Sequence, residues 1–593
     1  MFVKETKVKR AGREYVYLQL IDGYRDASGK VKHRVVANLG RKDALKDSGQ
    51  LEALAGSFAR LDPPMAGTRR GVGPLLLVEH FLRALDVQGT VDGALPRSAR
   101  SVLSVGEVVC ALVASRLCSP SPLYDVAGWA SGAAVQELLG IPPALLNDDR
   151  LGRALETFAV YAEDVRSRVA ARAIASYGIA AGRLHVDLTT VGVSGAFEQS
   201  ALIAKGWASD RRVARQVRTL QASTPDGTVL YSRPDPGNAA ELTLVGASLE
   251  RLLQISGPGL LIVCDSAMGA PKTLREIDQA GVRFVVPLRA SAGFRERFLT
   301  DCGHDQLRAV RYVPEREARR PAADRTRFRG AMRDWELAAS DTQPPLRLRV
   351  AYIHSSEEAA QVAAARERAL QKAEDELARM RNGLGGRYYK TREQIERRVG
   401  QVIGSNITGL IHVTVTASSD TLAVTWQRDH AAIADAAALD GIYALATNLP
   451  GRITPGQILR LYKDQQIVER RHRDMKHSLK VRPIFLHNDD RVYALLSIVG
   501  ISLLIFGLIE AQTRAALGAD QQLPGLLPEG RAARPTGRNI LAAFQGFGLT
   551  YTPTGIQLDT LTDTQQHILE LLQIELPWPT QADLALTNRG KRG

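Results

Sequence analysis

Cysteine is scarce in this sequence, and its scarcity limits the kinds of site that the chain can build. The four cysteines among 593 residues form no Cys-x-x-Cys pair: Cys110, Cys118, Cys264 and Cys302. This spacing makes neither a zinc site nor a disulfide framework, and it fits a reducing cytoplasm. The N-terminus also lacks an apolar run behind its first charged residues, so the sequence predicts no signal peptide. We therefore expect a cytoplasmic protein.

Long hydrophobic runs are nearly absent too, because only residues 492–509 form one. This run is almost long enough to cross a bilayer, which takes about 20 residues. It contains Ser497, Ser502 and two glycines, and it directly follows a strongly charged segment. We therefore interpret it as the buried helix of a large domain, and we expect no membrane contact.

Acidic residues are too few to balance the basic ones. The chain has 63 Asp and Glu against 77 Lys and Arg, which gives a net charge of +14. An excess of this size suits a polyanionic partner, most simply nucleic acid. The apolar content of 45% is that of an ordinary globular protein, and the length predicts three or four domains.

The N-terminal third of the chain divides into two regions. Residues 1–60 predict a basic β-hairpin module, with strands at 15–21 and 31–36 joined by a turn at 26–29. Its basic residues either contact a DNA backbone or form a solvated edge that discourages aggregation. Residues 73–180 predict a helical domain, which we regard as a candidate DNA-binding domain.

After Gly182 the pattern changes to that of an α/β fold, in which short helices separate apolar strands. The predicted strands are 184–190, 213–222, 229–233, 259–265 and 283–288, and the helices between them are 240–253 and 273–279. This region, 182–290, is interrupted by an insertion at 291–438 and resumes at 439–515. A tail rich in Pro and Gly occupies 516–593, with a helix predicted at 561–572.

The insertion has two notable parts. Nine arginines between residues 308 and 333 either grip DNA or form a solvated surface. Helices predicted at 356–381 and 391–403 form a hairpin, which either contacts a second subunit or stands as an exposed arm. Residues 411–426 are strand-like.

A helix with a polar face is predicted near residue 469. Thr454 and Pro455 begin it and Pro483 ends it. Polar residues recur along it at spacings of 3, 4, 4 and 3 and share one face: Tyr462, Gln465, Glu469, Arg473 and Lys476. Leu461, Val468 and Met475 form a second, apolar stripe about 100° away. The helix therefore packs on one side and presents charged groups beside it.

Three acidic residues from separate elements carry the chemistry. The strand that begins at Leu184 is expected to have Asp187 at its carboxyl end, and the strand at 259–265 is expected to have Asp265 there. The carboxyl end of a strand in an open sheet faces the ligand crevice. Each aspartate alone is better explained as a helix cap or turn former. Together with Glu469 they favour a metal site, because Mg²⁺ prefers carboxylate oxygens. Two such ions about 3.5–4 Å apart clamp both oxygens of a phosphoryl displacement.

The spacing Tyr462-x2-Gln465-x3-Glu469-x6-Lys476 resembles the Tyr-Arg-Glu-Lys signature of a superfamily of bacterial insertion-sequence DDE transposases. Other segments, in the same order along the chain, also resemble this family: residues 36–40, 185–190, 206–211, 216–217, 234–243, 262–265, 439–443 and 447–448. The resemblance extends from the N-terminus to about residue 510. The order and spacing of these segments are more specific than any one of them.

The resemblance implies an RNase H-like catalytic core, interrupted by an insertion domain between the second aspartate and the glutamate. It implies that Asp187, Asp265 and Glu469 hold two Mg²⁺ or Mn²⁺ ions. One ion would activate water to cut double-stranded DNA at the ends of the element, and the freed 3′-hydroxyl would then attack target DNA. Tyr462 and Lys476 would contact terminal nucleotides and phosphates. A homodimer in the synaptic complex and an association with the bacterial nucleoid follow from the same resemblance.

Gln465 departs from the signature, which has arginine at this position. Glutamine carries no charge, so Arg473, or Arg470 and Arg471, would have to bind the phosphate. We include Gln465, Arg470 and Arg473 with Tyr462 and Lys476 as candidate DNA-binding residues. His472 and His477 are expected to contact phosphate or solvent and not metal, because the carboxylates suffice.

The leading hypothesis is a DNA transposase that binds terminal inverted repeats, cuts them and transfers the strands. A domesticated DNA-binding protein without activity is the first alternative, and the presence of all three acids argues against it. A nuclease of the same fold is the second, and it would use the same three residues.

Overall fold

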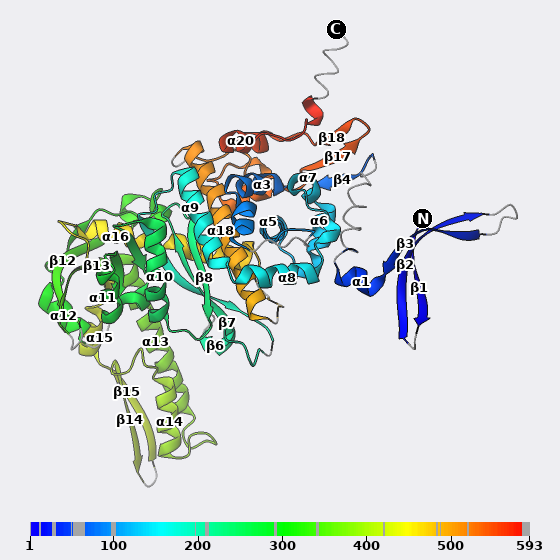
Figure 1. Cartoon of the computed structure of the whole chain (residues 1–593). Coiled ribbons are helices and arrows are strands. Elements are labelled where there is room, and N and C mark those ends of the chain that lie inside the picture. The colour runs from blue at the N-terminus through cyan, green and yellow to red at the C-terminus, as the bar shows by residue number, and fades with distance from the viewer. Residues whose placement is uncertain are drawn as a thin grey trace. The chain divides into compact units, whose positions relative to one another are not determined.

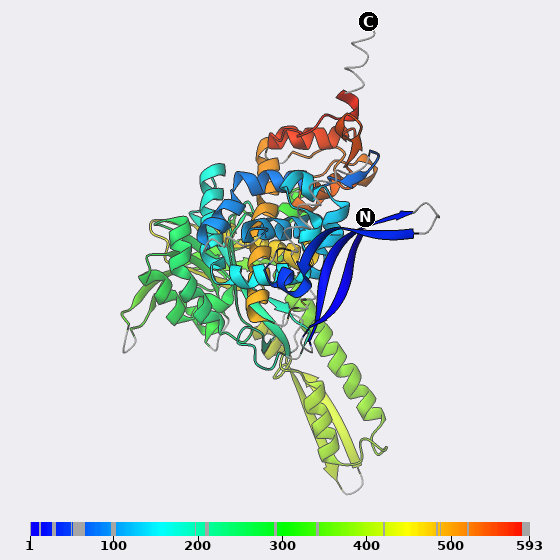
Figure 2. The ribbon, with the colours of Figure 1, turned by 45° about the vertical axis from the view of Figure 1, so that its right-hand side comes forward.

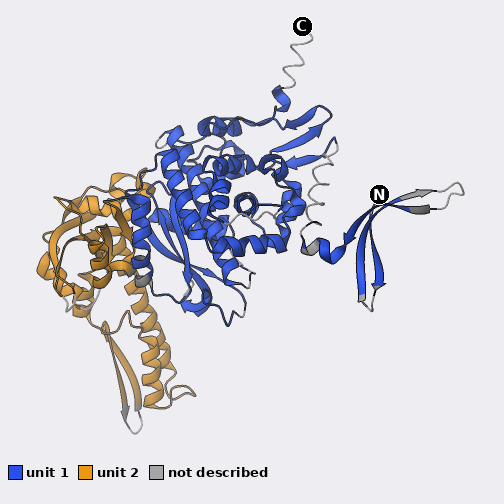
Figure 3. Cartoon of the chain, viewed as in Figure 1, with its two compact units in different colours: residues 1–257, 466–593 blue, residues 258–465 orange. Residues whose placement is uncertain are grey.

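The computed structural model describes residues 2–583, with the exception of 11–12, 26–30, 49, 51–65, 96–101, 196, 208–212, 290–292, 340–342, 419–420, 482–483, 485, 487 and 519–520. The chain forms two compact units, shown in Figure 3. Unit 1 comprises residues 1–257 and 466–593, and unit 2 comprises residues 258–465. The second boundary falls inside the segment that was predicted to be one polar-faced helix.

Unit 1 begins with three antiparallel strands, β1 (Phe2–Arg10), β2 (Arg13–Arg25) and β3 (Val31–Arg41), followed by α1 (Lys42–Asp47). The predicted hairpin corresponds to β2 and β3. The first strand was not predicted because its charged sequence, FVKETKVKR, lacks a buried apolar face: Val3 and Val8 are exposed. The predicted turn at 26–29 lies outside the described residues, as do residues 51–60 of the module.

Helices make up most of the described part of residues 75–177, in agreement with the prediction from the sequence (Figure 1). They are α3 (Leu75–Ala84), α4 (Val87–Ala94), α5 (Val105–Cys118), α6 (Val126–Gly132), α7 (Val135–Leu139), α8 (Asp148–Ala159) and α9 (Ala162–Tyr177). Four of them, α3, α5, α8 and α9, contact α18 (Asp489–Leu517). Within the described part of the chain, α18 alone is long and apolar enough to cross a membrane, and 94% of its most apolar window is buried. It is the central helix of unit 1, in agreement with the buried-helix interpretation.

The C-terminal segment is folded, so the interpretation of 516–593 as a tail is wrong for its described residues. It contains α19 (Gly537–Ala543), β17 (Gly548–Thr552), β18 (Gly555–Leu558) and α20 (Asp563–Leu572). Strand β17 pairs with β4 (Arg69–Gly71), and α20 packs on α18. Short strands between Pro and Gly residues give too little periodicity to predict from sequence. The predicted helix at 561–572 is present, with Thr562 as its N-cap.

Unit 1 also contains an antiparallel sheet, three strands of which lie where they were predicted; the strand at 204–207 was not predicted. Strand β5 (Arg183–Gly192) pairs with β7 (Val213–Ser223), and β7 pairs with both β6 (Ala204–Trp207) and β8 (Val229–Pro236). Helix α10 (Glu241–Ser256) follows. Strand β8 packs on α18 and α9, which connects this sheet to the helical core. Part of the family-like segment 206–211 lies outside the described residues.

Unit 2 has a mixed sheet in the order β11-β12-β13-β16-β10-β9. Its strands are β9 (Leu261–Cys264), β10 (Arg283–Leu288), β11 (Arg308–Val310), β12 (Phe328–Leu337), β13 (Leu346–Ser355) and β16 (Ile442–Thr447). Strands β9 and β10 are parallel, and the other pairs are antiparallel. Helices α11 (Pro271–Gln279), α12 (Phe294–Asp301), α15 (His430–Ala437) and α16 (Pro455–Lys463) complete the unit.

The insertion predicted at 291–438 is therefore not a separate domain, because β11, β12 and β13 share the sheet of β9, β10 and β16. Only the part from α13 (Ser356–Asn382) through α14 (Arg392–Val402) to the hairpin of β14 (Ile411–Ser418) and β15 (Thr421–Arg428) projects as an arm, yellow-green in Figure 2. The arm has its own apolar cluster, which includes Leu370, Leu377 and Ile395.

Candidate active site

Asp187 lies in the middle of strand β5 and not at its end, which corrects the sequence-based placement. The strand continues to Gly192 through Leu188-Thr-Thr-Val, whose β-branched residues favour extended backbone. Asp187 lies opposite Gln221 of β7. Its Oδ1 accepts the Leu188 N–H at 2.8 Å, and its side chain is 17% exposed. A carboxylate is thus held on the sheet with part of its surface accessible.

The polar-faced helix is broken into three segments: α16 (Pro455–Lys463), α17 (Gln466–Arg473) and a π-helical turn, η6 (Asp474–Ser478). Thr454 caps α16 in a capping box with Gln457, as its sequence predicts. The break occurs because the Gln465 N–H bonds to the Tyr462 carbonyl, three residues back, which tightens and closes the turn. The predicted terminus, Pro483, lies outside the described residues.

The break divides the predicted polar face between the two units. Tyr462 and Gln465 belong to unit 2, whereas Glu469, Arg473 and Lys476 belong to unit 1. Glu469 and Arg473 are exposed one turn apart on α17, and Gln465 is buried. The apolar stripe is confirmed at two of its three positions, since Val468 and Met475 are buried, whereas Leu461 is half-buried in α16.

His472 connects α17 with the strand that carries Asp187. Helix α17 packs on β5 and β7, and His472 Nδ1 lies 3.5 Å from Asp187 Oδ2. Burial, with a smaller effect of Lys476, lowers the pKa of His472 to about 3, so its imidazole is neutral. Glu469 precedes His472 by one helical turn. Unit 1 thus brings Asp187 beside the helix that bears Glu469.

The expectation that His472 contacts phosphate or solvent is wrong, because the residue is buried. The sequence contained a signal for this. His472 follows Val468 by four residues and precedes Met475 by three, so it lies on the apolar stripe. A polar residue on such a stripe is expected to face the neighbouring strands.

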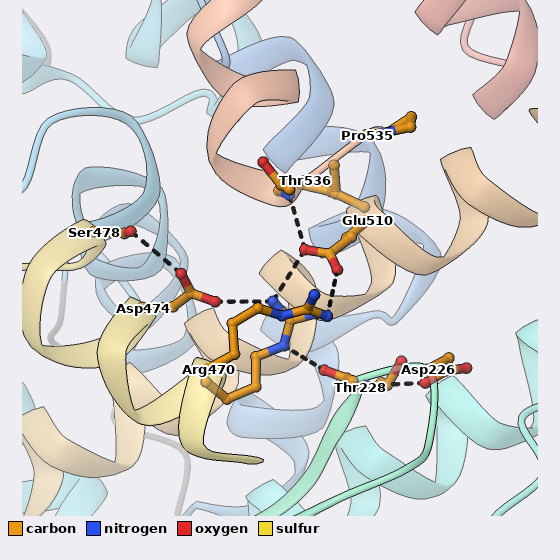
Figure 4. Close-up of polar contacts among 12 residues, drawn as sticks. Asp226, Thr228, Arg470, Asp474, Ser478, Glu510, Pro535 and Thr536 are labelled. Atoms are coloured by element: carbon orange, nitrogen blue, oxygen red, sulfur yellow. Dashed lines mark hydrogen bonds and ion pairs between the residues drawn. The ribbon is translucent and has the colours of Figure 1, made fainter. Parts of the chain in front are cut away.

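Arg471 is also buried and cannot reach DNA, which corrects its suggested role in replacing the signature arginine. Its side chain is fully enclosed and donates to the Gly227 carbonyl at 2.6 Å. It also pairs with Asp474 at 3.0 Å and with Glu510 at 3.1 Å (Figure 4). Arg470 pairs with Glu510 at 2.9 Å and is 35% exposed. Of the four consecutive residues 470–473, only Arg473 is exposed.

In unit 2, Asp265 directly follows β9, as predicted, and precedes the short 3₁₀ turn η3 (Ser266–Gly269). Its side chain is half-buried. Tyr462 packs against Tyr443, with ring centroids 6.4 Å apart. Among the described residues, no three His, Cys, Asp or Glu side chains form a ready-made metal-binding group. The chemistry of the three acids nevertheless fits a hard divalent cation, which takes carboxylate oxygens.

The arginines of residues 308–333 were predicted either to bind DNA or to form a solvated surface, but several of them do neither. Arg325 donates to the carbonyls of Ala318 and Arg320, and Arg333 donates to that of Asp301. Arg329 bonds to the carbonyls of His304 and Leu307 in the same way. Several of these arginines therefore brace loops that lack regular backbone hydrogen bonds.

Carboxylates such as those of Asp187 and Glu469 are suited to hold the divalent ions that assist phosphoryl transfer. Residues 183–505 match the family of the transposase DDE domain. This match spans more than half of the chain, so the chain belongs to that family, whose members are enzymes dependent on divalent metal ions. Residues 3–64 match the N-terminal domain of IS1634 family transposases. Residues 69–170 match a domain family of unknown function.

A search of curated proteins gives no match. Among solved structures, one similar chain is that of the "Mos1 transposase paired-end complex with left transposon end", at 8% identity. The similarity covers 32% of this chain and 60% of that chain, with a TM-score of 0.13. A score this low carries no argument about the fold or the site.

Proposed function

We propose that this protein cuts DNA at the terminal inverted repeats of an insertion sequence and joins the freed ends to target DNA. The observation that carries the proposal is the placement of Asp187 beside α17, the helix of Glu469, within a region that matches the DDE domain. A partly exposed carboxylate and an exposed one on adjacent elements suit a site at which metal and phosphate meet.

Asp187, Asp265 and Glu469 would hold the divalent ions, which we propose to be two Mg²⁺ or Mn²⁺. The ions would activate water, or the 3′-hydroxyl of the cut DNA strand, as the nucleophile and would neutralise charge on the phosphate. The protein itself would fix the positions of the carboxylates that bind the ions. The neutral His472 imidazole faces Asp187 and does not compete with a metal ion for that carboxylate, as a protonated imidazole would.

DNA contacts are proposed for Arg473, Lys476 and Tyr462, in line with the Tyr-Arg-Glu-Lys signature. Gln465 is buried, which argues against the DNA contact expected for it. Arg473 is the strongest candidate to replace the missing signature arginine, since it is exposed on the same helix as Glu469. Arg470 contributes less, because its guanidinium is engaged by Glu510. The basic N-terminal strands and the helices of 73–180 are proposed to bind double-stranded DNA, in a homodimer that pairs two ends.

The proposal is tested with the full chain and a DNA fragment that carries the inverted repeats flanking its gene. We expect cleavage with Mg²⁺ or Mn²⁺ and none after chelation. Asp187→Asn, Asp265→Asn and Glu469→Gln should each abolish cleavage while DNA binding persists. Glu393→Gln, at an exposed carboxylate of the arm, is the matched control and should cut normally.

The DNA products of the reaction distinguish the proposed transposase from the two alternative functions. Joined DNA molecules exclude a simple nuclease, whereas cleavage without joining favours one. Binding that weakens steeply with salt, without any cleavage, would indicate a domesticated DNA-binding protein. Normal cutting by the Asp187 or Glu469 variant would refute the assignment of the site.

A further inference from the structure

Glu510 is a carboxylate buried in the apolar core helix α18, where an unpaired charge would be very unfavourable. Its side chain is 1% exposed. Oε1 accepts from Arg470 at 2.9 Å and from Arg514 at 2.6 Å, while Oε2 accepts from Arg471 at 3.1 Å and from the Gly537 N–H at 3.0 Å. The carboxylate is thus fully satisfied by its four donors, several of which Figure 4 shows.

Two of these donors belong to α17, the helix of Glu469. Arg471 extends the contacts further, because it also bonds to the Gly227 carbonyl in the β7–β8 turn and to Asp474 in η6. Helix α17 is therefore tied to α18, to the β7–β8 turn and to the π-helical turn that follows it. We call this set of charged residues the Glu510 cluster: Arg470, Arg471, Asp474, Glu510 and Arg514.

Apolar side chains contribute little to fixing the position of α17. The helix has eight residues, and its buried side chains are Val468, Arg471 and His472, so Val468 is the single apolar one. Buried ion clusters of this kind stabilise a fold less than apolar residues of the same size would. Removing one partner from such a cluster is nevertheless strongly destabilising, because it leaves buried charge uncompensated. Here the Glu510 carboxylate is satisfied, whereas Arg470 Nε and Arg471 Nη2 lack a hydrogen-bond partner among the described residues. The orientation of α17 therefore depends on the Glu510 cluster.

The charge of Glu510 persists at neutral pH. Burial by itself would raise the pKa of this carboxyl, but Arg471, Arg470, Arg514 and the Gly537 N–H outweigh it and hold the pKa below its usual value. The carboxylate therefore remains an acceptor for all of its donors.

We propose that Glu510 is a positioning residue for catalysis: it holds α17 so that Glu469 is presented beside Asp187, without itself touching metal or DNA. Glu469 immediately precedes Arg470, so a rotation of α17 that follows loss of the cluster displaces the Glu469 carboxylate directly. The inference rests on the proposed role of Glu469.

The test compares Glu510→Gln with Ser502→Ala in the full-length protein. Glutamine keeps the size of the side chain but removes its charge and places an amide donor against arginines. Ser502 is an equally buried residue of α18 whose hydroxyl bonds only to the Ile498 carbonyl of the same helix. We expect Glu510→Gln to slow single-turnover cleavage about 100-fold, as small displacements of reacting groups do. Its affinity for DNA ends should be unchanged, and Ser502→Ala should cut at the normal rate.

Hydrogen exchange provides a readout that does not depend on activity. We expect Glu510→Gln to accelerate exchange in residues 466–478 and to leave α5, which also packs on α18, protected. Acceleration throughout unit 1, or cleavage at the normal rate, would overturn the proposal. Should Glu510→Gln fail to fold, Asp474→Asn removes one outer contact of Arg471 and should show the same pattern more weakly.

Glu469→Gln tests the proposed active site separately from the positioning role of Glu510. If this variant cuts DNA normally, the proposed site is wrong, whatever Glu510→Gln does. If it is inactive while Glu510→Gln cuts normally, only the positioning role of Glu510 is wrong.

Discussion

Gly227, in the turn between β7 and β8, is the most informative place to perturb the Glu510 cluster by size alone. Its φ is +92°, a conformation that L-residues disfavour. A Cβ at this position would lie 2.7 Å from Arg471 Nη2 and 3.2 Å from Arg471 Cζ. The guanidinium cannot move aside freely, because the side chain is fully enclosed and held by Gly227, Asp474 and Glu510.

Gly227→Ala should therefore destabilise unit 1 by two effects. The backbone strain amounts to about 1–2 kcal/mol, and a displaced buried hydrogen bond adds about 1–3 kcal/mol. Gly546→Ala is the matched control: its φ is +88°, but a Cβ there would meet nothing within 4 Å. The control should lose only the stability that the backbone strain costs.

The measurement is the apparent free energy of unfolding in urea for the full chain, together with the cleavage rate. We expect Gly227→Ala to lose about 1–3 kcal/mol more than Gly546→Ala, and to cut DNA more slowly. An equal loss of unfolding free energy in the two variants would show that the Arg471 side chain moves aside without destabilising the fold. The Glu510 cluster would then not be rigid.

Two further predictions concern charge. The pKa of Glu510 lies below its usual value of 4.5, so its contribution to stability is complete above that value and disappears as the pH falls through its folded pKa. The difference in unfolding free energy between the native chain and Glu510→Gln should therefore be constant from pH 7 to about pH 5 and shrink below it; a difference that grows on acidification would contradict this. Arg473→Gln should weaken binding to DNA ends and reduce the slope of log affinity against log salt by about 1, whereas an unchanged slope would exclude a phosphate contact.

Much of the local structure was predictable from the sequence because it depends on residues close together in the chain. The helices of 73–180, the strands at 183–192 and 283–288 and the cap at Thr454 follow from periodicity and capping residues. The burial of α18 followed from its continuous apolar run beside a charged segment.

Other features were missed because their causes are distant in the chain. The break between α16 and α17 goes against an unbroken helical pattern, and it coincides with the boundary of the two units. Glu510 looked like the first polar residue after an apolar run. Arg514 lies one turn further along α18, but the other partners are distant: Arg470 and Arg471 lie about 40 residues upstream in α17, and Gly537 is the first residue of α19. Little in the local sequence therefore indicated a buried cluster.

The amino-acid sequence by itself determined the positions of most helices and strands, the basic balance of the chain and the three acids that point to metal-dependent chemistry on DNA. Those properties arise from local periodicity and from residue type. The tertiary structure decided which polar residues are available for that chemistry: it exposes Glu469 and Arg473 and encloses Arg471 and His472. The reason is that burial depends on which elements pack together, and a helix with two polar sides can turn either of them inward until its partners are in place.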